Sequence, residues 1–598
     1  MCGISGVAGR PAVTTPDLLS HRGPDGSDEV HLDLRGYPAM LHHARLAIVD
    51  LTPAGDQPMA NEDRRFVMVF NGEIYNHLEL RAYCEAKGHT FSSKMDGEVI
   101  LHLWEMEGYQ CLTRLNGIFA VAIADTLTGE LFLARDPLGV KPLVYVVEQG
   151  GSITFGSEPT ALSKLGADIG NPSVEALGAF LSFLWVPAPL TPFRNVRSIP
   201  IGHVLRWAGG ETPTLTQYRR VAPQPEGVTR RSLDEAVAEL GDLIDIATQR
   251  QLLGDVPISV MASGGVDSSL VWDAAGPGVD QAFTIRWPVG SGEGSAEDAE
   301  AVVRIQESLH TPVHYIDGSE AKHTYLPLSG DVYADPAFEL TRLISCHTRQ
   351  CGRKVLLSGQ GGDELFGGYR RHMVAPYLGH VYSGRLGSSL PAVLRPASGK
   401  LGAEFATRFL RASSHRDPFL RYMELCTYSN ASERAAVLGC GESEVSNEVV
   451  FASHRAAWES LPAGLSFLRK MMAVDLTVYL PGLGLSYVDR AGMEFGVEIR
   501  VPWLDLDLVD WSFTLADDLL VKRMQGKLVP KALARGVIPP DVVDRPKRGF
   551  GSPASTLSTG RQTEGERGHR QGKYFALASD VTARWLETVP EMAAVGAG

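Results

Sequence analysis

The sequence predicts an α/β protein in two parts, a layered and largely antiparallel first part followed by a parallel sheet with helices. The first third holds short β-type runs that end at turn signals, such as residues 66–70 before Asn71-Gly72. From Val256 onward, strands, Gly-rich turns and helical patterns alternate, which is typical of a parallel sheet. With 44% hydrophobic residues among 598, the chain can fill large cores of this kind.

The elements of the first part and the linker after it follow from local composition. Residues 66–70 and 118–123 are apolar runs of strand length. Residues 221–227 are rich in Pro, Gly and polar side chains, and residues 232–253 then show helical spacing of Leu, Val and Ile. We therefore expect two domains, 1–220 and 221–598.

The second part contains four apolar runs that we expect to be parallel strands: 256–260, 282–285, 313–316 and 355–357. Helical patterns separate them, and residues 373–545 are mostly helical in pattern. The tail after Phe550 carries no chemical signature.

Charge and composition exclude several classes of partner. The net charge of −14 disfavours binding to nucleic acids or anionic membranes. No apolar stretch approaches the roughly 20 residues that span a bilayer, and the amino terminus has no basic or long apolar leader. Seven cysteines in this length fit reduced thiols better than disulfides. We expect a cytoplasmic protein without nucleic-acid or membrane partners.

Cys2 is the first candidate nucleophile. Removal of Met1 would place a free α-amine and a thiol on one residue, and an amine with a pKa of about 7.7–8.0 can accept the thiol proton. Taken alone, a cysteine at position 2 could equally be a chance residue of a flexible terminus. The neighbouring motifs decide whether Cys2 is a nucleophile.

These motifs resemble the class II (N-terminal nucleophile) glutamine amidotransferases, and among them the asparagine synthetase family. The resemblance rests on residues 2–6 (CGISG), 21–26 (HRGPDG), 45–50 (RLAIVD), 71–76 (NGEIYN), 96–100 (DGEVI) and 135–139 (RDPLG). It implies an Ntn-type αββα sandwich, followed by a parallel-sheet α/β adenylating domain with added helices.

The resemblance also implies roles for five residues beside Cys2. Arg45 would bind the α-carboxylate of glutamine, Glu73 and Asp96 would bind its α-ammonium, and Asn71 with the Gly72 amide would form the oxyanion hole. Each residue type suits its role, since Arg forks onto carboxylates and two amide donors can face one oxyanion. Asn71-Gly72 could equally be a plain hairpin turn, and Arg45 or Asp96 a surface charge.

A second motif, residues 263–269 (SGGVDSS), follows an apolar strand and opens a helix, so its amides form an anion cradle. It lacks the Lys of the P-loop pattern, which argues against ordinary γ-phosphoryl transfer. The string resembles the loop of ATP pyrophosphatases. Residues 357–369 (LSGQGGDELFGGY), 488–494 (VDRAGME), 500–505 (RVPWLD) and 545–550 (RPKRGF) are similar to further asparagine synthetase signatures.

This resemblance implies an ATP site with Mg²⁺. The ATP-binding residues would be Ser263, Gly264, Gly265, Asp267, Ser268, Ile285, Ser358 and Gly359. Asp267 and Asp363 would hold Mg²⁺, although Asp in such places also caps helices. Lys547 would stabilise the adenylation transition state, with a solvated surface lysine as the alternative.

The expected reaction is glutamine- and ATP-dependent amidation of a small carboxylic acid through an acyl-adenylate. The sequence departs from the family at two positions, with Gln360 in place of an acidic residue and Arg286 in place of Gly. Either the acceptor is an acid other than aspartate or these changes are neutral, and both interpretations stay open. Whether the chain forms a homodimer is open as well.

Other classes of enzyme fit less well. A peptide- or β-lactam-forming synthetase with a vestigial glutaminase domain is the alternative, but the glutaminase residues are retained. A sugar-phosphate amidotransferase would lack residues 263–269.

Overall fold

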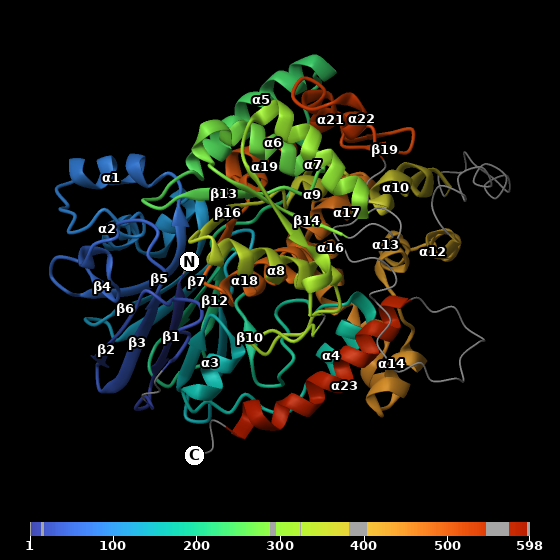
Figure 1. Ribbon diagram of the computed structural model, residues 1–598. Helices are drawn as coiled ribbons and strands as arrows, with labels where there is room; N and C mark the ends of the chain where they lie inside the picture. Colours follow the sequence, from blue (N-terminus) through green and yellow to red (C-terminus); the bar gives the residue numbers. More distant parts are fainter. Residues whose placement is uncertain are drawn as a thin grey trace.

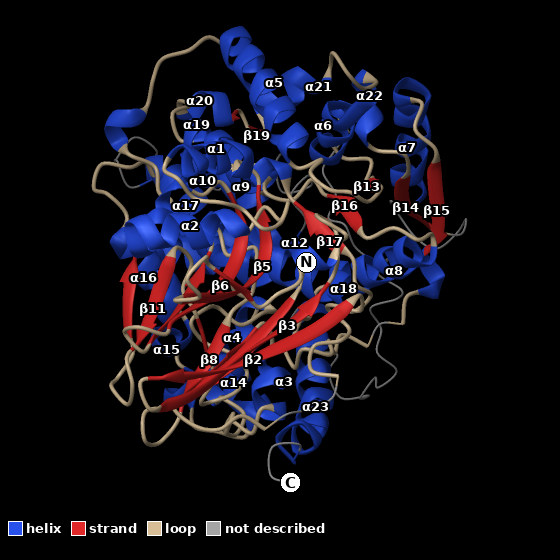
Figure 2. Ribbon diagram, turned by 90° about the vertical axis from the view of Figure 1, so that its left-hand side faces the viewer, coloured by secondary structure: helices blue, strands red, loops and turns tan. Residues whose placement is uncertain are grey.

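The computed structural model describes residues 2–13, 17–287, 295–322, 324–381, 403–545 and 573–594. Two antiparallel sheets and one parallel sheet dominate these residues (Figures 1 and 2). The antiparallel sheets precede residue 220 and the parallel sheet follows it. The predicted order of an antiparallel part and a parallel part is confirmed.

The first two sheets stack face to face. One has the order β10-β8-β9-β1-β3-β2 and the other β12-β11-β7-β6-β5-β4. The strands are β1 Gly3–Ala8, β2 Gly26–Leu34, β3 Tyr37–Arg45, β4 Met59–Ala60, β5 Phe66–Ile74, β6 Gly117–Asp125, β7 Glu130–Arg135, β8 Val144–Val147, β9 Ile153–Gly156, β10 Arg197–Ser198, β11 His203–Trp207 and β12 Thr214–Gln217. Apolar side chains from both sheets, including Ile4, Val69, Leu133 and Phe155, form one core between them.

Helices cover the outer faces of this pair of sheets. α1 (His77–Ala86) and α2 (Glu98–Glu107) lie on the side of β5, while α3 (Pro159–Lys164) contacts β8 and β9. The result is an αββα sandwich, as the resemblance implied.

The parallel sheet has the order β15-β14-β13-β16-β17. Its strands are β13 Ile258–Met261, β14 Ala282–Arg286, β15 Val313–Asp317, β16 Val355–Leu357 and β17 Glu498–Arg500. The first four match the predicted strands to within two residues. β17 corrects the prediction, because it lies within residues 373–545, which we expected to be mostly helical. Strand order reverses between β13 and β16, and ligands of open α/β sheets bind at such a point.

Helices surround this sheet and extend beyond it. Those before residue 370 are α4 Val174–Phe183, α5 Leu233–Arg250, α6 Val266–Ala275, α7 Ser295–Leu309, α8 Pro336–Gln350 and α9 Gly362–Phe366. Those after it are α10 Arg370–Val381, α12 Ala403–Ser414, α13 Pro418–Cys426, α14 Ala431–Leu438, α15 Asn447–Val450, α16 Ala452–Ser460, α17 Phe467–Val474, α18 Leu485–Met493, α19 Leu506–Ser512, α20 Asp517–Leu520, α21 Leu528–Ala534, α22 Pro540–Val543 and α23 Lys573–Ala594. A short hairpin pairs β18 (Val521–Lys522) with β19 (Gln525–Gly526).

The start of α5 shows why the sequence folds as predicted after the linker. Ser232 accepts a hydrogen bond from the Glu235 amide, and the Glu235 side chain accepts one from Ser232 N, so the two form a capping box. Within the predicted linker, residues 221–227, only the short turn Pro225–Gly227 is regular.

The continuous helix Phe467–Met493 is long and apolar enough to cross a membrane by length and composition, which the sequence analysis did not find. However, 72% of its apolar window is buried inside the protein, as in the core helix of a soluble protein. Its middle, Asp475–Gly484, is π-helical and contains Pro481.

The carboxy-terminal helix α23 packs on α3 and α4 (Figure 1). Trp585 is buried, its ring is tilted against that of Phe193 (5.4 Å between ring centres), and it donates a hydrogen bond to Gly330 O (3.0 Å), so the helix also contacts the second part of the chain. This tail thus has a packing role that the sequence did not indicate.

Candidate active sites

One cavity in the amino-terminal part gathers most of the residues that we expected to process glutamine. It has about 320 Å³ of empty space, its mouth included. Its lining contains Cys2, Arg45, Gly72, Glu73 and Asp96, which sequence reasoning singled out, and His43 and Gln57, which it did not. Cys2 stands just before β1, and its burial raises the pKa of its thiol.

Asn71 lies next to Cys2 and presents an unused donor. Its Oδ1 accepts a hydrogen bond from Cys2 N (2.9 Å), and its Nδ2 is buried without a hydrogen-bond partner among the described residues. A buried amide donor with no partner is costly unless a ligand takes it up. The arrangement suits an oxyanion hole.

Asn71 and Gly72 do not form the hairpin turn that the dipeptide also allowed. Both lie inside β5, paired with Ala120 and Phe119 of β6. A Cβ on Gly72 would come within 2.0 Å of Ile118 O, so only glycine fits there. The dipeptide therefore brings backbone and amide donors to the cavity from a rigid strand.

Arg45 ends β3, and its guanidinium is fixed at the cavity by the following loop. Nη1 donates to Thr52 O (3.0 Å) and to Asp56 Oδ1 (2.6 Å), and Nη2 donates to Asp50 O. Asp56 is half exposed, so its carboxylate can give way to a ligand carboxylate on Arg45.

Two buried carboxylates face the same cavity. Burial raises the pKa of Glu73 well above its ordinary value, although Arg500 opposes the effect, and burial also raises the pKa of Asp96. Asp96 accepts a hydrogen bond from Ile74 N (2.5 Å). A cationic ligand between them would favour their ionised forms, which fits an ammonium group.

Arg500 connects this cavity to the parallel sheet, and sequence reasoning assigned it no role. It lies in β17, is fully buried, and its Nη2 is 2.9 Å from Glu73 Oε1. Its Nε donates to Glu498 Oε1 (2.5 Å), and its backbone O accepts from Ser358 N (2.9 Å). The signal was available, since Arg500 opens a signature motif, but the two partners that connect the sites, Glu73 and Ser358, lie more than 100 residues away in sequence.

The second set of predicted residues meets at the switch point of the parallel sheet. The loop after β13 contains Ser263, Gly264 and Gly265, and the first turn of α6 contains Asp267 and Ser268. The loop after β16 contains Ser358 and Gly359. The neighbouring strand β14 contains Ile285. A Cβ on Gly359 would lie 2.6 Å from Ser268 N, so this glycine lets the two loops touch. Ser263 Oγ and Ser268 Oγ are 2.8 Å apart.

Asp267 and Asp363 converge on one cation, which is Lys527. Its Nζ is 2.6 Å from Asp363 Oδ1 and also pairs with Asp267 Oδ2. Burial alone would lower the pKa of Lys527, and the two carboxylates raise it above its ordinary value. Neither Asp is an N-cap, because Gly265 and Gly361 hold those positions. Sequence reasoning missed Lys527, which no spacing rule connects to either motif.

The residues present at this point fit Mg²⁺. Two carboxylates from separate loops supply the oxygen ligands that this ion prefers. Lys547, the expected transition-state cation, lies outside the described residues. Arg545, two positions earlier, donates a hydrogen bond to Gly264 O (2.9 Å) and pairs with Asp298 Oδ1 (2.9 Å). The chain at Arg545 is therefore attached to the 263–269 loop.

The two departures from the family differ in their surroundings. Gln360 Nε2 donates to the buried Tyr487 OH (2.8 Å). Arg286 is exposed at the carboxyl end of β14, with its guanidinium 5.7 Å from the Tyr315 ring centre. Gln360 is therefore part of the packed site, whereas Arg286 lies at its rim.

Comparisons with known proteins show the family to which this chain is similar. A family model described as a glutamine amidotransferase domain matches residues 1–219, and one described as asparagine synthase matches residues 239–567. The glutamine-hydrolysing asparagine synthetase 1 of Bacillus subtilis (strain 168) is 29% identical over 573 residues, which is 92% of this chain and 87% of that protein. Asparagine synthetase 2 of Oryza sativa subsp. japonica, also glutamine-hydrolysing, is 33% identical over 398 residues, 63% of this chain and 61% of that protein. The chain therefore belongs to the asparagine synthase family and is a glutamine-dependent carbon–nitrogen ligase.

Proposed function

We propose that this ligase hydrolyses glutamine at Cys2 and uses the ammonia to amidate an acyl-adenylate made from ATP and a small carboxylic acid. Family membership supports glutamine and ATP as substrates. The observation that carries the two-site reaction is Arg500, whose side chain pairs with Glu73 in one site and whose backbone bonds Ser358 in the other.

At the first site, the proposal assigns each lining group to one part of glutamine. Arg45 binds the α-carboxylate, and Glu73 with Asp96 binds the α-ammonium. The thiol of Cys2 attacks the side-chain amide, and Asn71 Nδ2 with Gly72 N stabilises the oxyanion. Because burial raises the pKa of the thiol, a base must take its proton, and the α-amine left by loss of Met1 serves this purpose.

At the second site, the 263–269 loop and the start of α6 bind the triphosphate, with Ser358 and Gly359 closing the site from the other side. Asp267 and Asp363 would hold Mg²⁺, which neutralises phosphate charge when bound. Lys527 already lies between these carboxylates, so it can move onto a phosphate as they turn to the ion. Lys547 is proposed to stabilise the adenylation transition state.

Ammonia then passes inside the protein past the Glu73–Arg500 pair. Both side chains are buried, and exclusion of water protects ammonia and the adenylate from loss. We propose Arg500→Gln as the test. It should uncouple the sites, so that glutamate forms in excess over amide, while ammonia-dependent amidation continues. A ratio of one glutamate per amide in a folded variant would reject this route.

The acceptor is proposed to be aspartate or a related carboxylic acid. An amide at position 360, held by Tyr487, cannot attract a cationic group as strongly as a carboxylate. Assay with ATP, Mg²⁺, glutamine and aspartate decides between the two. Strong asparagine formation would remove the case for another acid, and amide formation only with another acid would establish it.

A further inference from the structure

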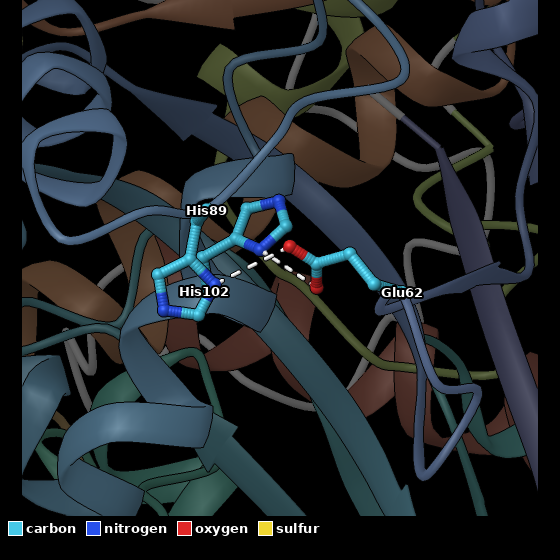
Figure 3. Close-up of side chains that lie close together, drawn as sticks. All are labelled: Glu62, His89 and His102. Atoms are coloured by element: carbon cyan, nitrogen blue, oxygen red, sulfur yellow. Dashed lines mark hydrogen bonds and ion pairs between the residues drawn. The ribbon is translucent and has the colours of Figure 1, made fainter.

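Three side chains that do not line the glutamine cavity converge on one point of the amino-terminal part (Figure 3). Glu62 comes from the turn between β4 and β5, His89 from the loop after α1, and His102 from α2. The Glu62 carboxylate lies between two rings, with Oε1 3.3 Å from His89 Nδ1 and Oε2 3.4 Å from His102 Nδ1. The candidate ligand atoms all lie within 4.8 Å of one another.

His102 is the buried member of this cluster, and its ring lacks the hydrogen bonds that a buried imidazole needs. Its side chain is 2% exposed, and neither ring nitrogen has a hydrogen-bond partner among the described residues. On the far side of the ring, Nε2 lies 3.8 Å from Glu98 Oε1. Buried polar atoms without partners are rare and call for an explanation such as an ion.

Glu98, on the far side of the His102 ring, acts as a hydrogen-bond acceptor. Its two oxygens accept hydrogen bonds from the backbone amides of Ser92 (2.7 Å) and Ser93 (2.9 Å) and from both hydroxyls. His102 therefore lies between two acceptor carboxylates, with Glu98 3.8 Å from Nε2 and Glu62 3.4 Å from Nδ1, and a neutral imidazole has one N–H to offer them. The ring nitrogen without a hydrogen then faces an acceptor, and a cation between the two would relieve their repulsion.

The distances leave room for a metal ion. A charge-assisted N–H···O⁻ bond is about 2.7–2.9 Å long. Ligands of a tetrahedral Zn²⁺ with bonds of about 2.0–2.1 Å are about 3.3–3.4 Å apart. The separation of His89 Nδ1 from Glu62 Oε1 (3.3 Å), a long hydrogen bond, and that of His102 Nδ1 from Glu62 Oε2 (3.4 Å) are both close to this second length, each with a different carboxylate oxygen.

We propose that Glu62, His89 and His102 bind one divalent transition metal, with Zn²⁺ as the natural choice. Two imidazoles and one carboxylate are ligands of that class, whereas Mg²⁺ and Ca²⁺ prefer oxygen alone. Glu105 follows His102 by one turn of α2, and its Oε2 is 4.0 Å from His89 Nδ1, so it can supply a fourth ligand. Glu98 Oε1 lies 3.8 Å from the second nitrogen of His102, on the side where carboxylates commonly lie behind zinc-bound histidines.

The metal would tie three segments together beside the glutamine cavity. α2 begins two residues after Asp96, which lines that cavity, and the loop from His89 leads directly to it. The proposed role is therefore structural: the ion fixes α2 and the loop before it.

The test uses the full-length chain with Cys2→Ala, which removes the nucleophilic thiol as a competing ligand. After treatment with a chelator, the protein is titrated with Zn²⁺, and binding, metal content and melting temperature are measured. One equivalent should bind and raise the melting temperature. X-ray absorption of the bound zinc should show nitrogen and oxygen ligands, imidazole among them, and no sulfur.

Matched variants locate the site. Glu62→Gln and His89→Gln should each weaken Zn²⁺ binding by at least about 100-fold. His31→Gln is the control, because His31 is an exposed histidine paired with Glu29 (3.0 Å) in the same part of the molecule, outside the cluster. Glu62 is partly exposed, so its substitution does not disturb the core. The proposal is overturned if less than one equivalent binds, or if Glu62→Gln binds zinc as tightly as His31→Gln does.

Discussion

The glutamine cavity and the nucleotide site differ in how their polar groups are arranged before any ligand binds. At the cavity, Asn71 Nδ2 is buried without a hydrogen-bond partner among the described residues, while Arg45 is paired with Asp56 and Glu73 is paired with Arg500. In the nucleotide site, Asp267 and Asp363 are drawn together by Lys527. The first site therefore has one donor ready for the oxyanion, whereas in the second both carboxylates must exchange an internal ion pair for contacts with a ligand.

The difference follows from the elements that build each site. Asn71 and Gly72 lie in β5, whose backbone is fixed by antiparallel pairing with β4 and β6, while the lining residues between 46 and 57 and at 95–96 lie outside the strands. The nucleotide site is formed by loops at the ends of short parallel strands, and one of these loops rests on the chain before Lys547. Strands hold donors in place without ligand, while charged loop residues neutralise one another until the ligand arrives.

The largest expected effect separates the two sites completely. Cys2→Ala should lower glutamine-dependent amidation by about 10⁴-fold or more, because no nucleophile remains. Ammonia-dependent amidation should stay near its original rate, since the nucleotide site is untouched. Steady-state assays with each nitrogen source measure both rates.

Loss of the ammonia-dependent rate as well would mean that the two sites do not divide the reaction. The mass of the intact wild-type protein provides a second check. Full glutamine-dependent activity in a protein that retains Met1 would contradict the proposed α-amine base.

Asn71→Ala tests whether the free amide donor is preformed for the oxyanion. Removing one such donor typically costs about 2.7–4 kcal/mol, so the glutaminase kcat should fall by about 10²–10³-fold with little change in KM. Glutamine titrations with and without ATP measure this. A rise in KM at constant kcat would instead assign Asn71 to substrate binding.

Lys527→Met tests the exchange of ion pairs in the nucleotide site. ATP–pyrophosphate exchange should fall by about 10²-fold, because one cation at the phosphates is lost. Without Mg²⁺ and ATP the variant should also be less stable, by about 3–5 kcal/mol, since two carboxylates lose their partner. Added Mg²⁺ should recover part of this stability.

Lys522→Met, at an exposed position of the hairpin that ends just before Lys527, is the control and should match wild type in both assays. Equal exchange rates for the two variants would show that Lys527 only bridges the carboxylates.

The smallest expected effect concerns Asp475, at the start of the π-helical stretch behind the nucleotide site. Burial opposes its ionisation, but Arg371 and His372 lower its pKa from 3.8 to about 2. Because the folded-state pKa lies below the unfolded one, this stabilisation is present above pH 4 and is lost as the pH falls toward 2. It amounts to about 2 kcal/mol.

Chemical denaturation of wild type and Asp475→Asn between pH 6 and 2 measures this contribution. The wild type should lose more stability than the variant over the range. Parallel curves would show that the ion pair does not carry this pH dependence.

Much of this architecture could be read from short stretches of sequence. Residues 355–357 form a strand as predicted, and residues 66–70 lie within the longer β5. Local rules failed at β17, because its sequence Glu-Ile-Arg is not an apolar run although all three residues are buried, and at α23, whose docking on α4 depends on the whole fold.

The site residues show the same division. Cys2, Arg45, Asn71, Gly72 and Asp96 belong to local motifs, and the fold gathers them because their strands are neighbours in two stacked sheets. Arg500 and Lys527 could not be assigned roles from the sequence. Glu73, the partner of Arg500, lies 427 residues away, and Asp267, one partner of Lys527, lies 260 residues away.

The sequence by itself determined the order of the two parts, the motifs at each site and the family to which the chain belongs. Only the tertiary structure decided which charges face one another: Arg500 on Glu73, Lys527 between two aspartates, and Glu62 between two histidines. The physical reason is the separation of the interacting residues along the chain. Strand and helix patterns arise between residues that are neighbours in sequence. A buried charge instead pairs with a residue of any distant segment that the fold brings within about 3 Å.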